Sequence, residues 1–128
     1  MWLYVGFGGA MGALTRYGVS LLFSSIQLFH FPIATFLVNL LGSFLLGFMI
    51  GYAKKNSLKH RKMYTSLTVG FLGSFTTFST FSIETVQLLE DGLIWISVIY
   101  VISSVLFGWM LASSGTNFGK RIILSGKG

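Results

Sequence analysis

Four long apolar stretches divide this chain, and each is about as long as a helix that crosses a membrane. They cover residues 2–23, 33–53, 63–88 and 93–114 of 128. About 20 predominantly apolar residues are needed for one helical span, and only 9% of the residues are charged, with a mean hydropathy of +0.77. We therefore expect an all-α membrane protein, a single domain over 1–128 with four transmembrane helices and no room for a soluble domain.

Lysine and arginine are concentrated on one predicted side of the membrane. Five lie in residues 54–62 and three in the C-terminal tail, and neither of the other two connections carries any. Short cytoplasmic loops are enriched in these residues, so both termini are expected mainly in the cytoplasm. This placement accounts for the net charge of +6 without a nucleic-acid partner.

The third stretch contains a run of glycine, serine and threonine over residues 70–82. These residues are weak helix formers, and hydroxyl groups compete with the helical hydrogen bonds. We therefore predict a helix break near the membrane midplane. Unwound backbone at this depth persists only where it is buried in protein, lines a wet cavity or binds an ion. The alternative is an unbroken helix with a serine- and threonine-rich packing face.

An aromatic pair lies inside this run. Phe78 and Phe81 are three residues apart and can share a helix face, beside the hydroxyl groups of Ser79 and Thr80. The edge of an aromatic ring is electropositive, so ring edges and hydroxyl donors together can receive a small anion. The alternative is ordinary core packing.

Further polar side chains lie within the second and fourth stretches. Asn39 can donate two hydrogen bonds to an anion, and Thr35 lies one turn before it on the same face. In the fourth stretch, Tyr100, Ser104 and Gly108 recur at helical spacing. These residues are candidates for an anion path, and bonding between helices is the alternative.

Two ionisable residues lie within the apolar stretches, Arg16 and Glu84. Such residues are functional candidates by default. Arg16 can draw anions into a vestibule, or its side chain can extend to the membrane surface. Glu84 is expected at the rim of the third span. The sequence has no cysteine and no pattern of nucleophile and base, so nothing indicates an enzyme.

Three segments together resemble the Fluc/CrcB family of fluoride channels, and the likeness covers almost the whole chain. They are GGAMGALTRY at 8–17, NLLGSF at 39–44 and GFLGSFTTFSTF at 70–81. The resemblance implies passive export of fluoride that relieves its toxicity, across a bacterial plasma membrane, by an antiparallel, dual-topology dimer with two fluoride paths.

The same resemblance implies roles for individual residues. Phe78 and Phe81 would form an aromatic box, Asn39 would be the pore asparagine, and Tyr100 with Ser104 would continue a polar track. The backbone carbonyls of Gly73 and Thr76 would hold a structural Na⁺ on the dimer axis. Gly108 stands where relatives can carry a track hydroxyl, so the far end of the track differs here.

The second subunit and the function class each leave an alternative. An antiparallel homodimer requires insertion in both orientations, whereas the strong charge bias favours one; a homologous partner chain of reversed bias is therefore an alternative to self-pairing. A small four-span multidrug antiporter is the alternative function. It would need a carboxylate in its first span, where this chain has Arg16. A non-transporting membrane subunit would not need the hydroxyl-rich break.

Overall fold

The computed structural model describes residues 1–26, 29–53 and 61–125, and its regular structure within these ranges is entirely helical. The expected all-α class is confirmed. In chain order the helices are α1 (Trp2–Phe23), α2 (Ile33–Ala53), α3 (Arg61–Thr65), the π-helix η1 (Ser66–Leu72), α4 (Gly73–Phe75), α5 (Phe78–Glu90) and α6 (Ile94–Ser125).

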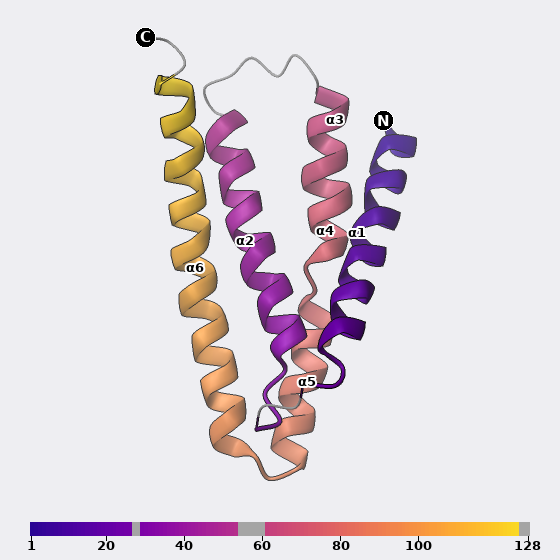
Figure 1. Ribbon diagram of the computed structural model, residues 1–128, viewed down its shortest axis with the longest axis vertical. Coiled ribbons are helices and arrows are strands. Elements are labelled where there is room, and N and C mark those ends of the chain that lie inside the picture. Colours follow the sequence, from indigo (N-terminus) through magenta and orange to yellow (C-terminus); the bar gives the residue numbers. More distant parts are fainter. Residues whose placement is uncertain (27–28, 54–60, 126–128) are drawn as a thin grey trace.

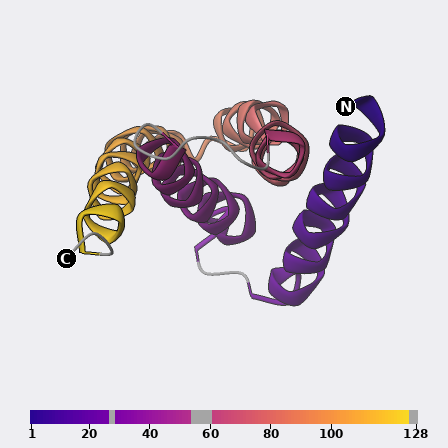
Figure 2. The same ribbon diagram turned by 90° about the horizontal axis from the view of Figure 1, so that it is seen from above.

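The helices run side by side along one axis. The start of α1, the start of α3 and the end of α6 lie at one end, and the turn between α5 and α6 lies at the other (Figure 1). Seen from above, α2 lies beside α6, while α1 lies on the other side of the α3–η1–α4 segment (Figure 2). The chain therefore consists of two helix pairs joined through α5.

Glycines allow close contact between α2 and α6. A Cβ atom on Gly47 or Gly51 would collide with backbone carbonyls of α6, and one on Gly115 or Gly119 would collide with carbonyls of α2. Small residues that let backbones approach are the usual basis of helix association in lipid. Gly8 and Gly12 of α1 meet the backbone of η1 in the same way.

The third apolar stretch is interrupted between α4 and α5. Thr76 and Thr77 leave the helical conformation, with φ/ψ of −75/154° and −146/120°. The predicted break is thus confirmed. Before it, residues 66–72 form a π-helix, which the sequence analysis did not anticipate. π-Helical turns are rare and often lie near functional sites.

Within the described ranges, two helices, α2 and α6, are long and apolar enough to cross a membrane. The helix α6 continues past residue 114 to Ser125, so Lys120 and Arg121 of the expected tail are helical. The basic residues within 54–60 and Lys127 lie outside the described residues.

Candidate functional site

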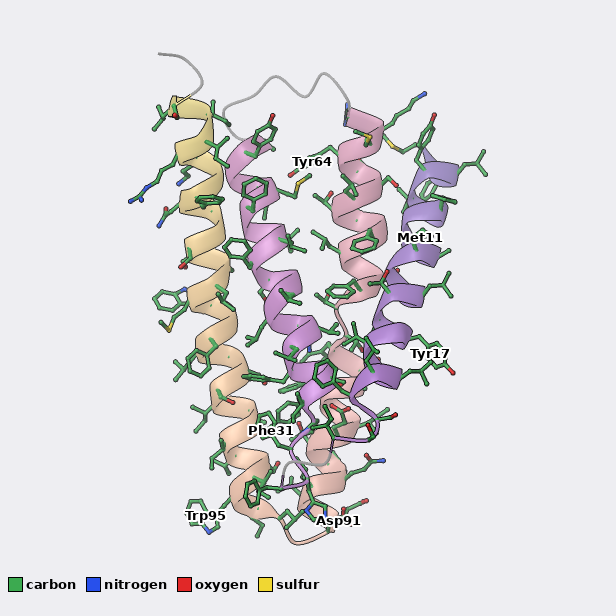
Figure 3. The ribbon with its side chains drawn as sticks, viewed as in Figure 1. Met11, Tyr17, Phe31, Tyr64, Asp91 and Trp95 are labelled. Carbon is green, nitrogen blue, oxygen red and sulfur yellow. The ribbon has the colours of Figure 1, made fainter. Side chains whose placement is uncertain are left out.

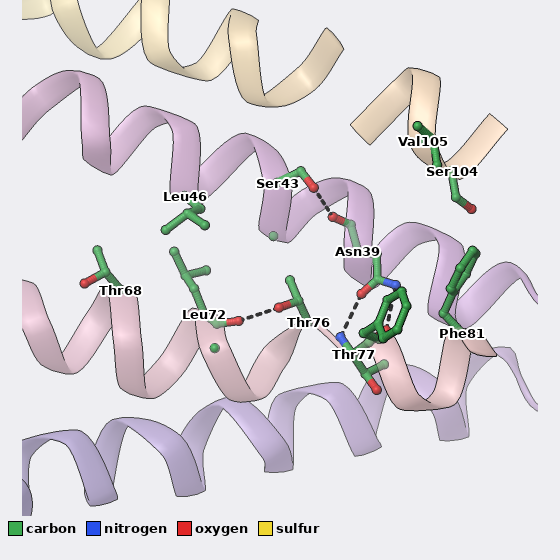
Figure 4. Close-up of a pocket in the computed structure, with 13 residues that line it drawn as sticks. Asn39, Ser43, Leu46, Thr68, Leu72, Thr76, Thr77, Phe81, Ser104 and Val105 are labelled. Atoms are coloured by element: carbon green, nitrogen blue, oxygen red, sulfur yellow. Dashed lines mark hydrogen bonds between the residues drawn. The ribbon is translucent and has the colours of Figure 1, made fainter. Parts of the chain in front are cut away.

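The side chain of Asn39, on α2, binds the extended backbone at the helix break. Its Oδ1 accepts the Thr77 N–H at 2.8 Å, and its Nδ2 donates to the Thr77 carbonyl at 3.0 Å (Figure 4). Thr77 is buried, and buried backbone needs partners for both groups. One amide side chain supplies both and fixes the break against α2.

The break releases carbonyl groups, among them those of Gly73 and Thr76, from helical hydrogen bonding. In an unbroken helix the Gly73 carbonyl would accept the Thr77 amide, and the Thr76 carbonyl would accept the Thr80 amide. Here the Thr77 amide donates to Asn39, and the Thr80 amide donates to Thr77 Oγ1 at 3.2 Å, which caps α5. The two carbonyls predicted to bind sodium are therefore those whose helical donors are engaged elsewhere.

A cavity of about 370 Å³ lies beside the break (Figure 4). Four of the predicted pathway residues line it, from three helices: Asn39, Phe78, Phe81 and Ser104. The Oγ of Ser104 is buried and has no hydrogen-bond partner in the described part of the chain. A buried polar atom without a partner is costly, so this hydroxyl is available to a ligand in the cavity.

Phe78 and Phe81 lie side by side, and only Phe81 packs against other side chains in the described part of the chain. The ring centroids of Phe78 and Phe81 lie 6.0 Å apart with the planes tilted by 36°. Phe81 also contacts Tyr100, at 5.0 Å between centroids. Phe78 is 79% exposed in the single chain. One ring is thus supported within the chain, and the other is left open beside the cavity.

A second cavity, of about 220 Å³, places Arg16 close to hydroxyl groups of other helices. It is lined by Ala13, Arg16, Tyr17, Ser20, Thr35, Val38, Thr77 and Thr80. Thr77 lines both cavities, so the two are neighbours at the helix break. The structure therefore brings Arg16 together with Thr35 and Thr80 of the predicted pathway.

Glu84, which the sequence places at the rim of the third span, accepts hydrogen bonds from two predicted pathway residues. Thr35 Oγ1 donates to one carboxylate oxygen and the Tyr100 hydroxyl to the other, both at 2.8 Å. Tyr100 has no exposed surface. The sequence carried a signal for half of this group: Glu84 and Tyr100 are equally distant from the turn at Gly92, which places them level in two antiparallel helices.

Two predicted pathway residues, Ser79 and Tyr100, line neither cavity. Ser79 is exposed, and its Oγ lies 3.3 Å from Thr77 Oγ1. Tyr100 lies behind Phe81 and binds Glu84. The two hydrogen bonds between Asn39 and Thr77 are not predicted by the sequence, which indicates Asn39 only as a donor to an anion.

The sequence matches one protein-family model and is similar to named relatives over most of its length. Residues 3–116 match the family model described as "CrcB-like protein, Camphor Resistance (CrcB)". The chain is 38% identical over 123 residues, 96% of this chain and 90% of the relative, to the protein named fluoride-specific ion channel FluC 1 of Bacillus cereus. It is 40% identical over 121 residues, 94% of this chain and 98% of the relative, to fluoride-specific ion channel FluC 2 of Staphylococcus saprophyticus.

Proposed function

The chain belongs to the CrcB family, and we propose that it is a fluoride-specific ion channel through which fluoride leaves the cell passively. The observation that carries this proposal is the cavity at the helix break, where Asn39, Ser104 and the aromatic pair meet. The names of the curated relatives support the choice of ion. The antiporter alternative is not supported. It would need a carboxylate within residues 2–23, where the sequence has none, and the chain matches the CrcB family model instead.

Fluoride would lose part of its hydration shell in this cavity and gain protein donors in exchange. Asn39 uses one N–H of its amide for the Thr77 carbonyl and retains the other for an anion. The Ser104 hydroxyl is a second donor without a protein partner in the described residues. The electropositive ring edges of Phe78 and Phe81 complete the site. These few small donors suit a small anion that has lost part of its hydration shell.

The second cavity is proposed as the vestibule. Arg16 attracts anions there, and the hydroxyl groups of Thr35 and Thr80 line the way to Thr77. Because Thr77 borders both cavities, movement past it connects the vestibule to the aromatic pair. Tyr100 supports Phe81 from behind.

We propose an antiparallel dimer as the working unit. Phe78 is 79% exposed and lines the cavity beside Asn39 and Ser104. Gly73 and Ser79 at the break are exposed as well, so in a single chain polar groups of the break would face lipid. Polar groups facing lipid cost several kcal/mol each, and a second subunit over the break would remove that cost. The partner is this chain inserted in the opposite orientation or a homologous chain.

A structural Na⁺ fits the oxygen atoms at the break. The carbonyls of Gly73 and Thr76 have lost their helical donors, and Gly73 is exposed. Hard cations prefer such oxygen ligands and take about six of them. One chain supplies two, so further oxygens from the second subunit are required. The ion would offset the cost of an anion at this depth.

Flux from liposomes tests the proposed function. Purified protein is reconstituted at low density into vesicles loaded with potassium fluoride, and release is started with valinomycin and followed with a fluoride electrode. We expect rapid fluoride release and no measurable chloride release from matched vesicles. Equal release of both ions, or release of neither, would refute the proposal.

A further inference from the structure

Ser43 lies one helical turn beyond Asn39 on α2 and lines the same cavity. Its Oγ donates to the Asn39 carbonyl at 2.8 Å (Figure 4). That carbonyl also accepts the helical amide four residues on, which is the Ser43 amide itself. The hydroxyl is thus a second donor to an oxygen already bonded, and it can turn toward the cavity without leaving that oxygen unpaired.

The facing position on α6 is Gly108, which brings no side chain to this place. A Cβ atom built on Gly108 would lie 3.7 Å from Ser43 Oγ, an ordinary contact, and would meet no other atom within 4 Å outside its own helix and neighbours. The space beside the Ser43 hydroxyl is therefore open. Ser104, with its unpartnered hydroxyl, lies one turn earlier on the same helix.

We propose that Ser43 is the donor that continues the fluoride path beyond Asn39 and Ser104, toward the ends of α2 and α6. In this chain α6 has no hydroxyl at position 108, and the hydroxyl of α2 occupies the opposite wall instead. This inference rests on the proposed fluoride channel and adds a specificity-determining residue to it. The single small O–H donor favours fluoride over larger halides, because it exchanges one short hydrogen bond for one water.

Exchange of the hydroxyl between the two helices tests the proposal. Four variants are reconstituted beside the wild type: Ser43→Ala, Ser43→Cys, Gly108→Ser, and the double variant Ser43→Ala/Gly108→Ser. Ser103→Ala is the matched control, because its Oγ also bonds a carbonyl four residues earlier, that of Ile99, but does not line the cavity. Fluoride and chloride release and elution as a monodisperse species are measured for each.

We expect Ser43→Ala to lower fluoride release about tenfold, which corresponds to about 1.4 kcal/mol and lies within the range of one hydrogen bond. Ser43→Cys keeps the volume with only a weak S–H donor and should fall between. The double variant should recover most of the flux, because the new hydroxyl would lie within reach of the same place. Ser103→Ala should conduct as the wild type does, and Gly108→Ser, which brings a second hydroxyl to the path, should not lower fluoride release.

The results separate this inference from the proposed function. A wild type that does not release fluoride would refute the channel itself. A conducting wild type with an equally active Ser43→Ala would overturn the role of Ser43 alone. Loss of flux in Ser43→Ala without recovery in the double variant, both eluting normally, would mean that Ser43 acts only in packing and would overturn it as well.

Discussion

Asn39 and Thr77 are joined by two reciprocal hydrogen bonds, in which one side-chain amide pairs with the N–H and the C=O of one backbone residue. This relationship makes the helix break a property of two helices rather than of one. The glycine- and hydroxyl-rich run weakens the third helix, and the amide from α2 determines which residue leaves the helix. The position of the break in turn forms the cavity and frees the Gly73 and Thr76 carbonyls from helical hydrogen bonding.

Removal of the Asn39 amide should therefore damage both folding and conduction. Asn39→Ala leaves the N–H and C=O of Thr77 without partners at membrane depth. We expect the free energy of unfolding to fall by about 2–4 kcal/mol and fluoride release to be lost. Asn39→Asp keeps an acceptor but not the donor, so it should also fail to conduct. Thermal unfolding in detergent and liposome flux measure the two effects.

Asn117→Ala is the control for this pair, because Asn117 is exposed on α6. It should change neither unfolding nor flux. If Asn39→Ala were as stable as the wild type, the two hydrogen bonds between Asn39 and Thr77 would not stabilise the break.

The two phenylalanines should separate conduction from stability. Phe78→Ile and Phe81→Ile each remove a ring but keep apolar bulk, so both should abolish fluoride release. Their stabilities should differ, because Phe78 is 79% exposed and Phe81 packs against Tyr100. We expect no change for Phe78→Ile in a single chain, and a loss of about 1 kcal/mol for Phe81→Ile. Flux and thermal melting are compared with those of Phe107→Ile, an exposed ring outside the cavity. Normal flux from both variants would remove the aromatic pair from the path.

The hydroxyl of Tyr100 should stabilise, through Glu84, the half of the fold that contains the turn between α5 and α6. Tyr100→Phe deletes a donor to a carboxylate oxygen at 2.8 Å in a fully buried place. Hydrogen bonds to charged groups are worth about 1.5–3 kcal/mol, and we expect a loss of that size in the free energy of unfolding. Tyr17→Phe, at an exposed residue, should be neutral. Equal melting of the two variants would show that the bond to Glu84 contributes no stability.

Close packing of α2 on α6 predicts opposite effects for two glycine substitutions. Gly51→Ala would press a methyl group into the Thr116 backbone and should destabilise by about 1–3 kcal/mol. Gly18 lies in α1, and a Cβ atom there would meet no atom within 4 Å. Alanine is a better helix former than glycine by about 1 kcal/mol, so Gly18→Ala should raise the melting temperature. An unchanged or raised melting temperature for Gly51→Ala would contradict the packing described for α2 and α6.

Much of the fold was predictable, because it depends on local composition. Apolar length gives the helices, and the weak helix formers at 70–82 give the break. The π-helix at 66–72 was not predictable, since π-helical turns are rare and local composition does not distinguish them from an α-helix. The grouping of Phe78 and Phe81 followed from spacing. The bonds of Asn39 to Thr77 and of Glu84 to Thr35 join residues far apart in sequence, and no local pattern encodes them.

Charge separation along the molecule leads to the last prediction, that this chain inserts mainly in one orientation and works best with an oppositely oriented, homologous partner. The start of α3, at Arg61, and the last turns of α6, with Lys120 and Arg121, lie at the end that holds the N-terminus (Figure 1). Asp91 and the exposed Trp95 lie at the opposite end (Figure 3). Eight lysines and arginines belong to the loop and tail on one side and none to the other two connections.

Short loops are where this bias controls insertion most strongly, whereas self-pairing in an antiparallel dimer requires both orientations in similar amounts. The chain is expressed alone in cells that lack their own fluoride exporter, with a reporter at the C-terminus that is active only in the cytoplasm or, in a second fusion, only outside it. We expect signal from the cytoplasmic reporter, and weak fluoride resistance that rises when a relative of reversed charge bias is co-expressed. Replacement of Arg61, Lys62, Lys120 and Arg121 by glutamine should shift the reporter toward mixed orientation and raise resistance of the chain alone. Equal signal from both reporters, with full resistance from the unmodified chain, would instead establish the homodimer.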